Sequence, residues 1–199
     1  MLTQTQELIL ELLLSNQEEH FSIRRISRLL GKSYALTYNN IQDLVSKHIL
    51  QKSSLPPAQI ISISNNIPSS FLLPVEQKRA QKLLEKYSWA NLYMHDVLQT
   101  APYPFFILLV FGSYAKESAT PKSDIDLLAI VPSKKEIPLL EQTLRHYTPV
   151  KKNILIVDTQ NFLDMIKNPK TFNVGNEARK HHIILYGAEI YYQLLEMQS

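Results

Sequence analysis

The chain lacks cysteine altogether and contains very little glycine. Without cysteine there is no disulfide, no cysteine-ligated zinc or iron–sulfur cluster and no thiol nucleophile. Only four of the 199 residues are glycine, where average usage would give about fourteen. Neither glycine-rich phosphate-binding pattern, G-x-G-x-x-G or G-x-x-x-x-G-K-[ST], occurs. Nucleotide binding through such a loop is therefore excluded, and each glycine becomes a marked position: Gly31, Gly112, Gly175 and Gly187.

Long hydrophobic runs are also missing. The longest uninterrupted apolar run is the seven residues from Phe105 to Phe111, far short of the ~20 residues that cross a bilayer. The first residues, MLTQTQELILELLL, lack a basic start and carry Glu7 and Glu11 among leucines. That pattern is typical of an amphipathic helix rather than a secretory signal. We therefore expect a soluble, cytoplasmic protein with no membrane partner.

Positive charge is concentrated in one short stretch. The formal net charge is only +3, yet residues 20–52 hold six basic residues against a single acid, Asp43. The six are Arg24, Arg25, Arg28, Lys32, Lys47 and Lys52. A local excess of this kind inside a nearly neutral domain predicts one face that binds an anion.

The first 66 residues predict a small domain of helices followed by two strands. Apolar residues recur at helical spacing in residues 2–15, and Ser22 and Ser33 are suited to cap two further helices. Gly31 directly follows the second of these helices, where a left-handed residue can end it. Beyond His48 the sequence becomes extended around two prolines, which predicts a two-stranded wing.

A second domain is predicted to follow a connection. Residues 66–76 are marked by prolines and residues 76–100 have a helical pattern, so we divide the chain into 1–66, a connecting segment and helix over 67–103, and 104–199. In the last part we expect strands at 105–111, 124–131 and 153–157, and helices near 136–147, 160–167, 174–182 and 187–197. Strands separated by helices predict a small mixed α/β sheet flanked by helices.

The histidines and the carboxy-terminal tyrosines have ordinary interpretations. The six histidines show no spacing typical of a metal site, and His181 and His182 are expected to end a helix, where its dipole favours positive charge. The tyrosines and leucines of residues 186–194 predict an amphipathic helix that belongs to the core or to a dimer interface.

The most specific pattern is a pair of acids in D-x-D spacing. Side chains at i and i+2 of a strand lie on the same face, so Asp124 and Asp126 are expected side by side at the start of an apolar strand. Adjacent carboxylates repel unless a cation lies between them. Mg²⁺ suits that position because it takes one or two carboxylates and completes its coordination with water and phosphate oxygens.

The strand before this pair ends in Gly112 and Ser113, and ten residues separate Ser113 from Asp124. A glycine there lets a phosphate approach the backbone, and the serine hydroxyl and nearby N–H groups can donate to it. Lys116 and Lys122 lie in the same loop and would add positive charge.

The segment GSYAKESATPKSDIDLLAI resembles the minimal nucleotidyltransferases of the DNA polymerase beta superfamily, whose pattern is a hydrophobic residue, Gly, Gly or Ser, a short helix and D-x-D before an apolar run. The resemblance covers roughly residues 105–160. It implies that Gly112, Ser113 and Ser123 lie at a bound nucleoside triphosphate and that Asp124 and Asp126 hold magnesium. The implied reaction is in-line attack on the α-phosphorus with release of pyrophosphate.

The sequence departs from that family at two places. The family usually carries a third carboxylate within the next strand, but residues 153–157 contain no acid. Asp158 follows this strand and is either the third catalytic carboxylate or a cap of the next helix. Without it the site lacks a general base, a loss that typically lowers the rate by ~10²–10⁴-fold. In addition, Glu117 stands where family members often have glycine.

Residues 1–66 resemble a winged helix-turn-helix domain. The resemblance implies that the third helix enters the major groove of DNA, where asparagine can bond an adenine edge. The candidates for base contact are Ser33, Tyr34, Leu36, Asn39 and Asn40, and those for phosphate contact are Arg24, Arg25, Arg28, Lys32 and, in the wing, Lys52. The third helix carries no arginine, so phosphate contacts are expected to dominate. His48 stands where such domains often turn with glycine. The alternative is that these helices contact another protein.

Two functions are consistent with these patterns. The first is a magnesium-dependent nucleotidyltransferase that transfers NMP, in particular AMP from ATP, to a protein or other acceptor. The resemblance to antitoxin-like members implies that this acceptor is the cognate toxin of a toxin–antitoxin pair. The second is a DNA-binding transcriptional regulator, expected to be a homodimer, whose transferase-like domain is catalytically degenerate and senses nucleotide or dimerises. An aminoglycoside-modifying enzyme would need a substrate domain for which 199 residues leave little room.

Overall fold

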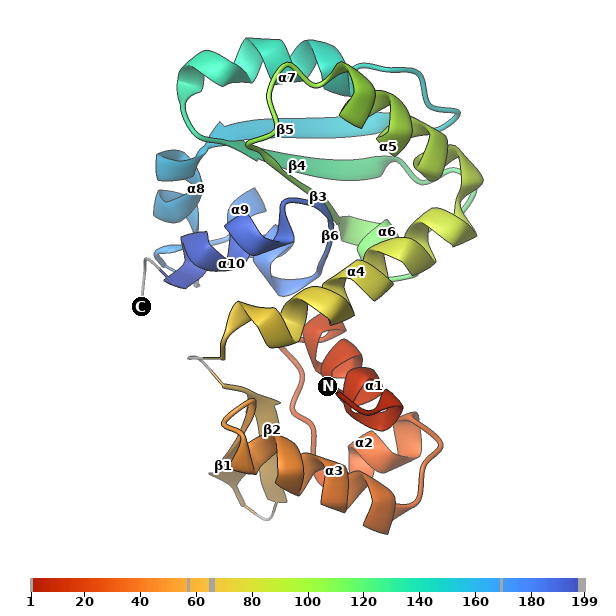
Figure 1. Cartoon of the computed structure of the whole chain (residues 1–199), viewed down its shortest axis with the longest axis vertical. Coiled ribbons are helices and arrows are strands. Elements are labelled where there is room, and N and C mark those ends of the chain that lie inside the picture. Colours follow the sequence, from red (N-terminus) through yellow and green to blue (C-terminus); the bar gives the residue numbers. More distant parts are fainter. Residues whose placement is uncertain (1, 57, 65–66, 169, 197–199) are drawn as a thin grey trace. The chain divides into compact units, whose positions relative to one another are not determined.

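The computed structural model describes residues 2–56, 58–64, 67–168 and 170–196 (Figure 1). It divides into two compact units, an N-terminal unit, Met1–Val75, and a C-terminal unit, Glu76–Ser199. The boundary falls inside helix α4 (Ser69–Lys86), which begins within the predicted connection and contains Pro74. The predicted connection therefore includes the first turns of α4, because the helix continues through the proline.

The N-terminal unit consists of helices followed by an antiparallel strand pair. In its described residues these elements are α1 (Gln4–Ser15), α2 (Ile23–Leu29), α3 (Tyr34–Ser46), β1 (Leu50–Leu55) and β2 (Ala58–Ile63). Ser22 accepts a hydrogen bond from the backbone N–H of Arg25, and Ser33 from that of Leu36, so both predicted caps are confirmed. Gly31 has φ +61° directly after α2, as its position predicts.

The core of this unit is aliphatic and comes from every helix and from the strand pair. The fully buried side chains include Ile9, Leu10, Ile26, Ile41, Leu44 and Ile49. The turn from α3 into β1 passes through His48, which has φ +57° although it is not glycine. The chain thus keeps at His48 the left-handed backbone for which glycine is usually selected.

The described part of the C-terminal unit is built on a four-stranded sheet in the order β5-β4-β3-β6. Its strands are β3 (Ile107–Phe111), β4 (Ile125–Val131), β5 (Lys152–Asp158) and β6 (His182–Tyr186). Strand β3 is antiparallel to both β4 and β6, whereas β5 is parallel to β4. The three predicted strands are present within two residues of their expected bounds.

Helices cover both faces of this sheet (Figure 1). Side chains alternate along β3, so that Leu108 and Val110 join one apolar cluster while Ile107 and Leu109 join the other. The first cluster is completed by α4, α5 (Ser88–Thr100) and α7 (Ile137–Leu144), and the second by α8 (Thr159–Ile166), α9 (Val174–Lys180) and α10 (Ala188–Glu196). Smaller elements are the turn of helix α6 (Gly112–Ala115) and the 3₁₀ turn η1 (Lys134–Glu136).

Two details differ from expectation. The predicted helix over 76–100 is interrupted at Tyr87, which separates α4 from α5. His182, expected to end a helix, instead begins the edge strand β6 and is buried. The segment HIILY is too short for its strand conformation to be predicted from the sequence. That conformation depends on pairing with β3, more than seventy residues earlier. Among the described residues no helix has both the length and the apolar character needed to cross a membrane.

Candidate active site

Asp124 and Asp126 lie at the edge of the sheet where β4 begins. Asp126 is the second residue of β4 and Asp124 directly precedes the strand. In the sheet register Asp126 stands between Phe111 at the end of β3 and Asn153 near the start of β5. Both aspartates are half-buried, so their carboxylates remain accessible to solvent while their backbones are fixed by the sheet.

Gly112 is required at this edge because Asp126 fills the space beside it. A Cβ at position 112 would overlap the Oδ2 atom of Asp126 and lie 3.2 Å from its Cγ, and the residue has φ +67°. From the sequence, this glycine was expected to let a phosphate approach the backbone. The structure instead places the carboxylate of Asp126 there, and Gly112 thereby lets the turn of α6 pass directly under the acid.

Each carboxylate also has a partner from the start of β5. Asn153 Nδ2 donates to Asp126 Oδ1 at 3.0 Å, and Lys151 Nζ lies 3.2 Å from Asp124 Oδ2. The backbone N–H of Ile125 donates to the Lys151 carbonyl at 2.8 Å, which fixes this part of β5 beside the pair. Sequence reasoning missed both Lys151 and Asn153, because only the parallel pairing of β4 with β5 brings them here.

Asp158 does not join this group. It pairs in register with Val131, five residues along β5 from Asn153, which corresponds to roughly 16 Å at the usual rise of a strand. Its carboxylate accepts from the backbone N–H of Asn161 at 3.0 Å and from the Asn161 side-chain amide at 2.7 Å. The assignment of Asp158 as the third catalytic carboxylate is therefore wrong, and the alternative, a cap of the following helix, is correct.

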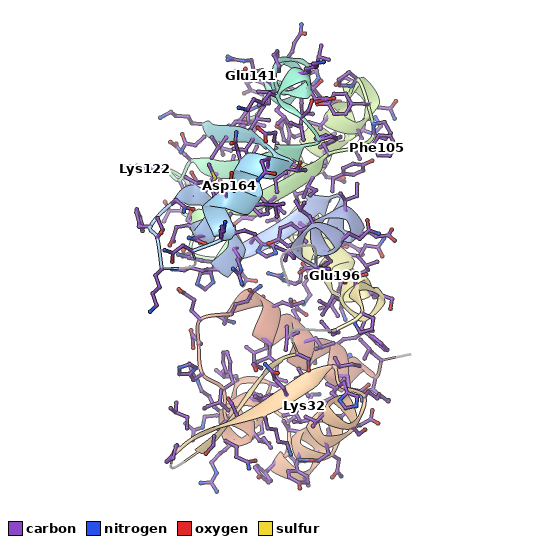
Figure 2. The ribbon with its side chains drawn as sticks, turned by 90° about the vertical axis from the view of Figure 1, so that its left-hand side faces the viewer. Lys32, Phe105, Lys122, Glu141, Asp164 and Glu196 are labelled. Carbon is purple, nitrogen blue, oxygen red and sulfur yellow. The ribbon has the colours of Figure 1, made fainter. Side chains whose placement is uncertain are left out.

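The loop between α6 and β4 carries the other predicted nucleotide-binding residues. Ser123 closes a turn, since its Oγ accepts from the backbone N–H of Thr120 at 2.9 Å. Ser113 is half-buried at the first turn of α6, and Lys116 and Lys122 are exposed; Figure 2 shows Lys122 at the periphery of its unit. Glu117 has φ +56°, so it adopts the left-handed backbone of the glycine that it replaces.

The hydroxyl of Tyr114 lies close to this loop but is not suited to act as a base. It reaches toward the Ser123 carbonyl at 3.5 Å. Burial, followed by the charges of Tyr87 and Asp124, raises the pKa of Tyr114. The phenol therefore keeps its proton near neutral pH and can serve only as a donor.

The donor set fits one magnesium ion. Asp124 and Asp126 would supply the anionic oxygen ligands of such an ion; within the described ranges no group of three or more His, Cys, Asp or Glu residues could hold a metal. One oxygen of each is engaged by Lys151 or Asn153. Mg²⁺ is bound in proteins by one or two carboxylates together with water and substrate phosphates, so these two acids are sufficient for an ion that also contacts a triphosphate.

Comparison with known families decides what kind of domain carries this pair. Residues 108–181 match the family model of the nucleotidyltransferase domain. This nucleotidyltransferase domain runs from β3 to the end of α9 and contains Gly112, Asp124, Asp126 and Asn153, so the resemblance seen in the sequence is confirmed for this part of the chain. The match supports transfer of a nucleoside monophosphate as its general chemistry. No curated protein and no solved structure matches the chain.

The predicted DNA-contact residues of the N-terminal unit include exposed side chains and side chains that already have partners within the chain. Arg24, Arg28, Lys32, Tyr34 and Asn39 are exposed, with Lys32 labelled in Figure 2. Four of the other candidates have intramolecular partners: Arg25 pairs with Glu19 and lies over the Phe21 ring, Asn40 bonds the Leu36 carbonyl and Thr3, Lys52 donates to Gln42, and Ser33 caps α3.

The exposed side of this unit is also apolar. Leu29, Tyr34, Leu36 and Tyr38 are among its exposed large hydrophobic residues, and the rings of Tyr34 and Tyr38 stack with centroids 6.1 Å apart. Three of these four residues lie on α3, and the exposed cations Arg28 and Lys32 precede that helix. The surface thus combines positive charge with aromatic and aliphatic groups.

Proposed function

We propose that the protein is a magnesium-dependent nucleotidyltransferase that transfers AMP from ATP to a protein acceptor. The observation that carries this proposal is the pair Asp124 and Asp126 at the start of β4, with Asp126 against Gly112, within the segment that matches the nucleotidyltransferase family. The resemblance to antitoxin-like members supports the toxin of a toxin–antitoxin pair as the acceptor.

The residues at this edge of the sheet would have different roles in the reaction. Asp124 and Asp126 would hold the magnesium ion, which supplies positive charge to the triphosphate and the leaving group. Ser113 would donate to a phosphate oxygen, and the exposed ammonium groups of Lys116 and Lys122 would add positive charge. An acceptor hydroxyl attacks the α-phosphorus, the bond to the bridging oxygen breaks, pyrophosphate leaves with that electron pair, and the acceptor proton passes to solvent.

The test is incorporation of label from ATP. With magnesium, [α-³²P]ATP should label the acceptor and [γ-³²P]ATP should not, which distinguishes nucleotidyl from phosphoryl transfer. The acceptors to test are the chain itself and the protein encoded beside it. Asp124→Asn and Asp126→Asn should abolish labelling. Asp164→Asn, at an exposed acid of α8 labelled in Figure 2, is the matched control and should retain it. Tight magnesium–ATP binding without any labelling would instead favour a nucleotide-sensing regulator.

A second function, DNA binding by the N-terminal unit, is supported by the exposure of Arg24, Arg28 and Lys32 beside α3. We propose that these cations contact phosphates and that Asn39 and Tyr34 face the bases, in a homodimer that reads two half-sites. Arg25, Asn40 and Lys52 contribute less, because each already has a partner within the chain.

Salt-dependent binding to the gene's own upstream DNA tests this second function. Each phosphate contact contributes about 0.9 to the slope of log K against log salt. The double variant Arg24→Ala/Arg28→Ala should therefore bind more weakly and reduce the slope by about 2. Lys134→Ala/Lys135→Ala removes two exposed charges from the C-terminal unit and should leave the slope unchanged. Equal effects of the two double variants would contradict direct phosphate contact.

A further inference from the structure

The start of β5 contributes an amide and an ammonium group to the acidic pair. Asn153 is the register partner of Asp126 and donates to its Oδ1 at 3.0 Å. Lys151, two residues earlier, lies 3.2 Å from Asp124. Because i and i+2 of a strand share a face, these two side chains lie on the same side of the sheet edge as the two aspartates.

We infer that Asn153 limits this site to a single metal ion, the one that enters with the nucleotide. The inference rests on the proposed nucleotidyl transfer and specifies how many metal ions take part in it. Asn153 is thus a positioning residue, which holds Asp126 without adding a negative charge.

The charge at this edge of the sheet is sufficient for one divalent ion only. Two carboxylates beside one ammonium group leave a single net negative charge at the edge of the sheet. The phosphates of a bound nucleotide can balance one divalent ion, but a second ion needs further anionic oxygens, which are the ligands that Mg²⁺ and Mn²⁺ prefer. Within the described residues no third acid lies close enough to complete such a group.

Lone pairs of both carboxylates are also occupied by donors. The amide of Asn153 turns an N–H group toward Asp126, so one oxygen of that carboxylate is occupied by a donor. A donor hydrogen repels a cation that would bridge the same oxygen. Lys151 acts similarly on Asp124 but through an exposed and movable side chain, 77% of which is accessible. Asn153 therefore opposes a second ion, whereas Lys151 weakens binding of the first ion until the nucleotide arrives.

The register makes the inference testable by one substitution. Residue 153 is fixed opposite Asp126 by the parallel ladder of β4 and β5 and by the hydrogen bond from Ile125 N to the Lys151 carbonyl. Asn153→Asp would place a carboxylate where the amide now lies, so three acids would face one point. Asn91→Asp makes the same change of charge at an exposed position of α5 and is the matched control.

The experiment counts Mn²⁺ ions bound per chain from the electron paramagnetic resonance signal of the free ion. Full-length protein is titrated with Mn²⁺ in the presence of an equal concentration of an α,β-methylene ATP analogue. Wild type and Asn91→Asp should each bind one ion, and Asn153→Asp should bind two. Without nucleotide, Lys151→Met should raise the affinity for Mn²⁺ at least threefold over wild type.

The outcomes separate this inference from the function on which it rests. Two ions bound by the wild type, or one ion bound by a folded Asn153→Asp variant, would overturn the inference and leave nucleotidyl transfer intact. Failure of the wild type to bind the analogue with any Mn²⁺ would instead overturn the proposed function. If Asn153→Asp does not fold, the wild-type count and the Lys151→Met affinity still decide.

Discussion

Replacement of Gly112 by alanine should destabilise the C-terminal unit through Asp126. The residue has φ +67°, and its added Cβ would overlap Oδ2 of Asp126. Two separate penalties are therefore expected, one from the backbone conformation and one from displacement of the acid.

The magnitudes can be assigned term by term. A left-handed backbone costs a residue with a Cβ roughly 1–2 kcal/mol. Moving Asp126 out of its rotamer costs about 0.5–1.5 kcal/mol, and losing its hydrogen bond with Asn153 costs about 1 kcal/mol more. Gly112→Ala should thus lower the free energy of unfolding by about 2.5–4.5 kcal/mol in the wild-type background. In an Asp126→Ala background only the backbone penalty remains, about 1–2 kcal/mol.

A double-mutant cycle in urea measures the difference. The single tryptophan, Trp89, lies in the C-terminal unit with its ring 6.0 Å from that of Tyr114, so its fluorescence reports unfolding of this unit. We expect a coupling free energy of about 1.5–2.5 kcal/mol between positions 112 and 126. Gly31→Ala is the control for the backbone alone, because its φ is +61° and nothing lies within 4 Å of the added Cβ; its effect, followed by circular dichroism, should be about 1–2 kcal/mol.

The reasoning is refuted if Gly112→Ala costs the same with and without the Asp126 carboxylate. That result would mean that the glycine is present for its backbone conformation only. A loss of magnesium–ATP binding in Gly112→Ala that exceeds its loss of stability would, in contrast, support the displacement of Asp126.

Three further predictions concern residues outside the acidic pair. His48→Gly and Glu117→Gly should each stabilise the protein by about 0.5–1 kcal/mol, measured by urea unfolding, because both residues have positive φ. Glu76→Gln should destabilise it by about 3–5 kcal/mol in the same assay, because Arg79, buried 2.7 Å away, loses its counter-charge. Burial lowers the pKa of His182 below its usual 6.5, so the folded state keeps the imidazole neutral. The contribution of His182 to stability is then fully present above about pH 6.5 and is lost as pH falls below it. The urea midpoint should therefore decrease as pH falls through this range, and in His182→Gln it should depend less on pH.

The features that the sequence predicted correctly depend on neighbours in the chain. Ser22 and Ser33 cap their helices through residues three positions later, and the D-x-D spacing puts Asp126 in β4 with Asp124 directly before it. Local rules of this kind need no knowledge of the tertiary fold. They placed this pair at the start of a strand before any sheet topology was known.

The features that were missed depend on pairing between distant segments. Asn153 and Lys151 reach the aspartates only because β5 lies parallel to β4, and a parallel partner cannot be read from either strand alone. Asp158 was assigned to the site because it follows the strand in which the resembled family carries its third carboxylate, yet the two ends of a strand lie far apart in space. The strand character of His182 likewise comes from pairing with β3.

Steric contacts explain why only some left-handed positions of this chain are glycine. At positions 48 and 117 the backbone is left-handed without glycine, and both side chains are exposed, so the chain accepts the backbone strain where a Cβ has room. Gly187 differs, since its Cβ would lie 2.5 Å from the Phe106 carbonyl. Gly112 belongs with Gly187 because its Cβ would meet Asp126. What requires glycine beside the acidic pair is thus the position of the Asp126 carboxylate.

This placement separates the site into two halves with different chemistry. The half built by β3, α6 and β4 holds two acids beside Gly112 and Ser113, which suits a metal–triphosphate. The half built by β5 offers Asn153 and Lys151, and neither an amide nor an ammonium group accepts a proton from an attacking hydroxyl near neutral pH. In the proposed transfer, activation of the acceptor would therefore not come from Asn153 or Lys151, and the rate should depend on the acidity of the acceptor's hydroxyl.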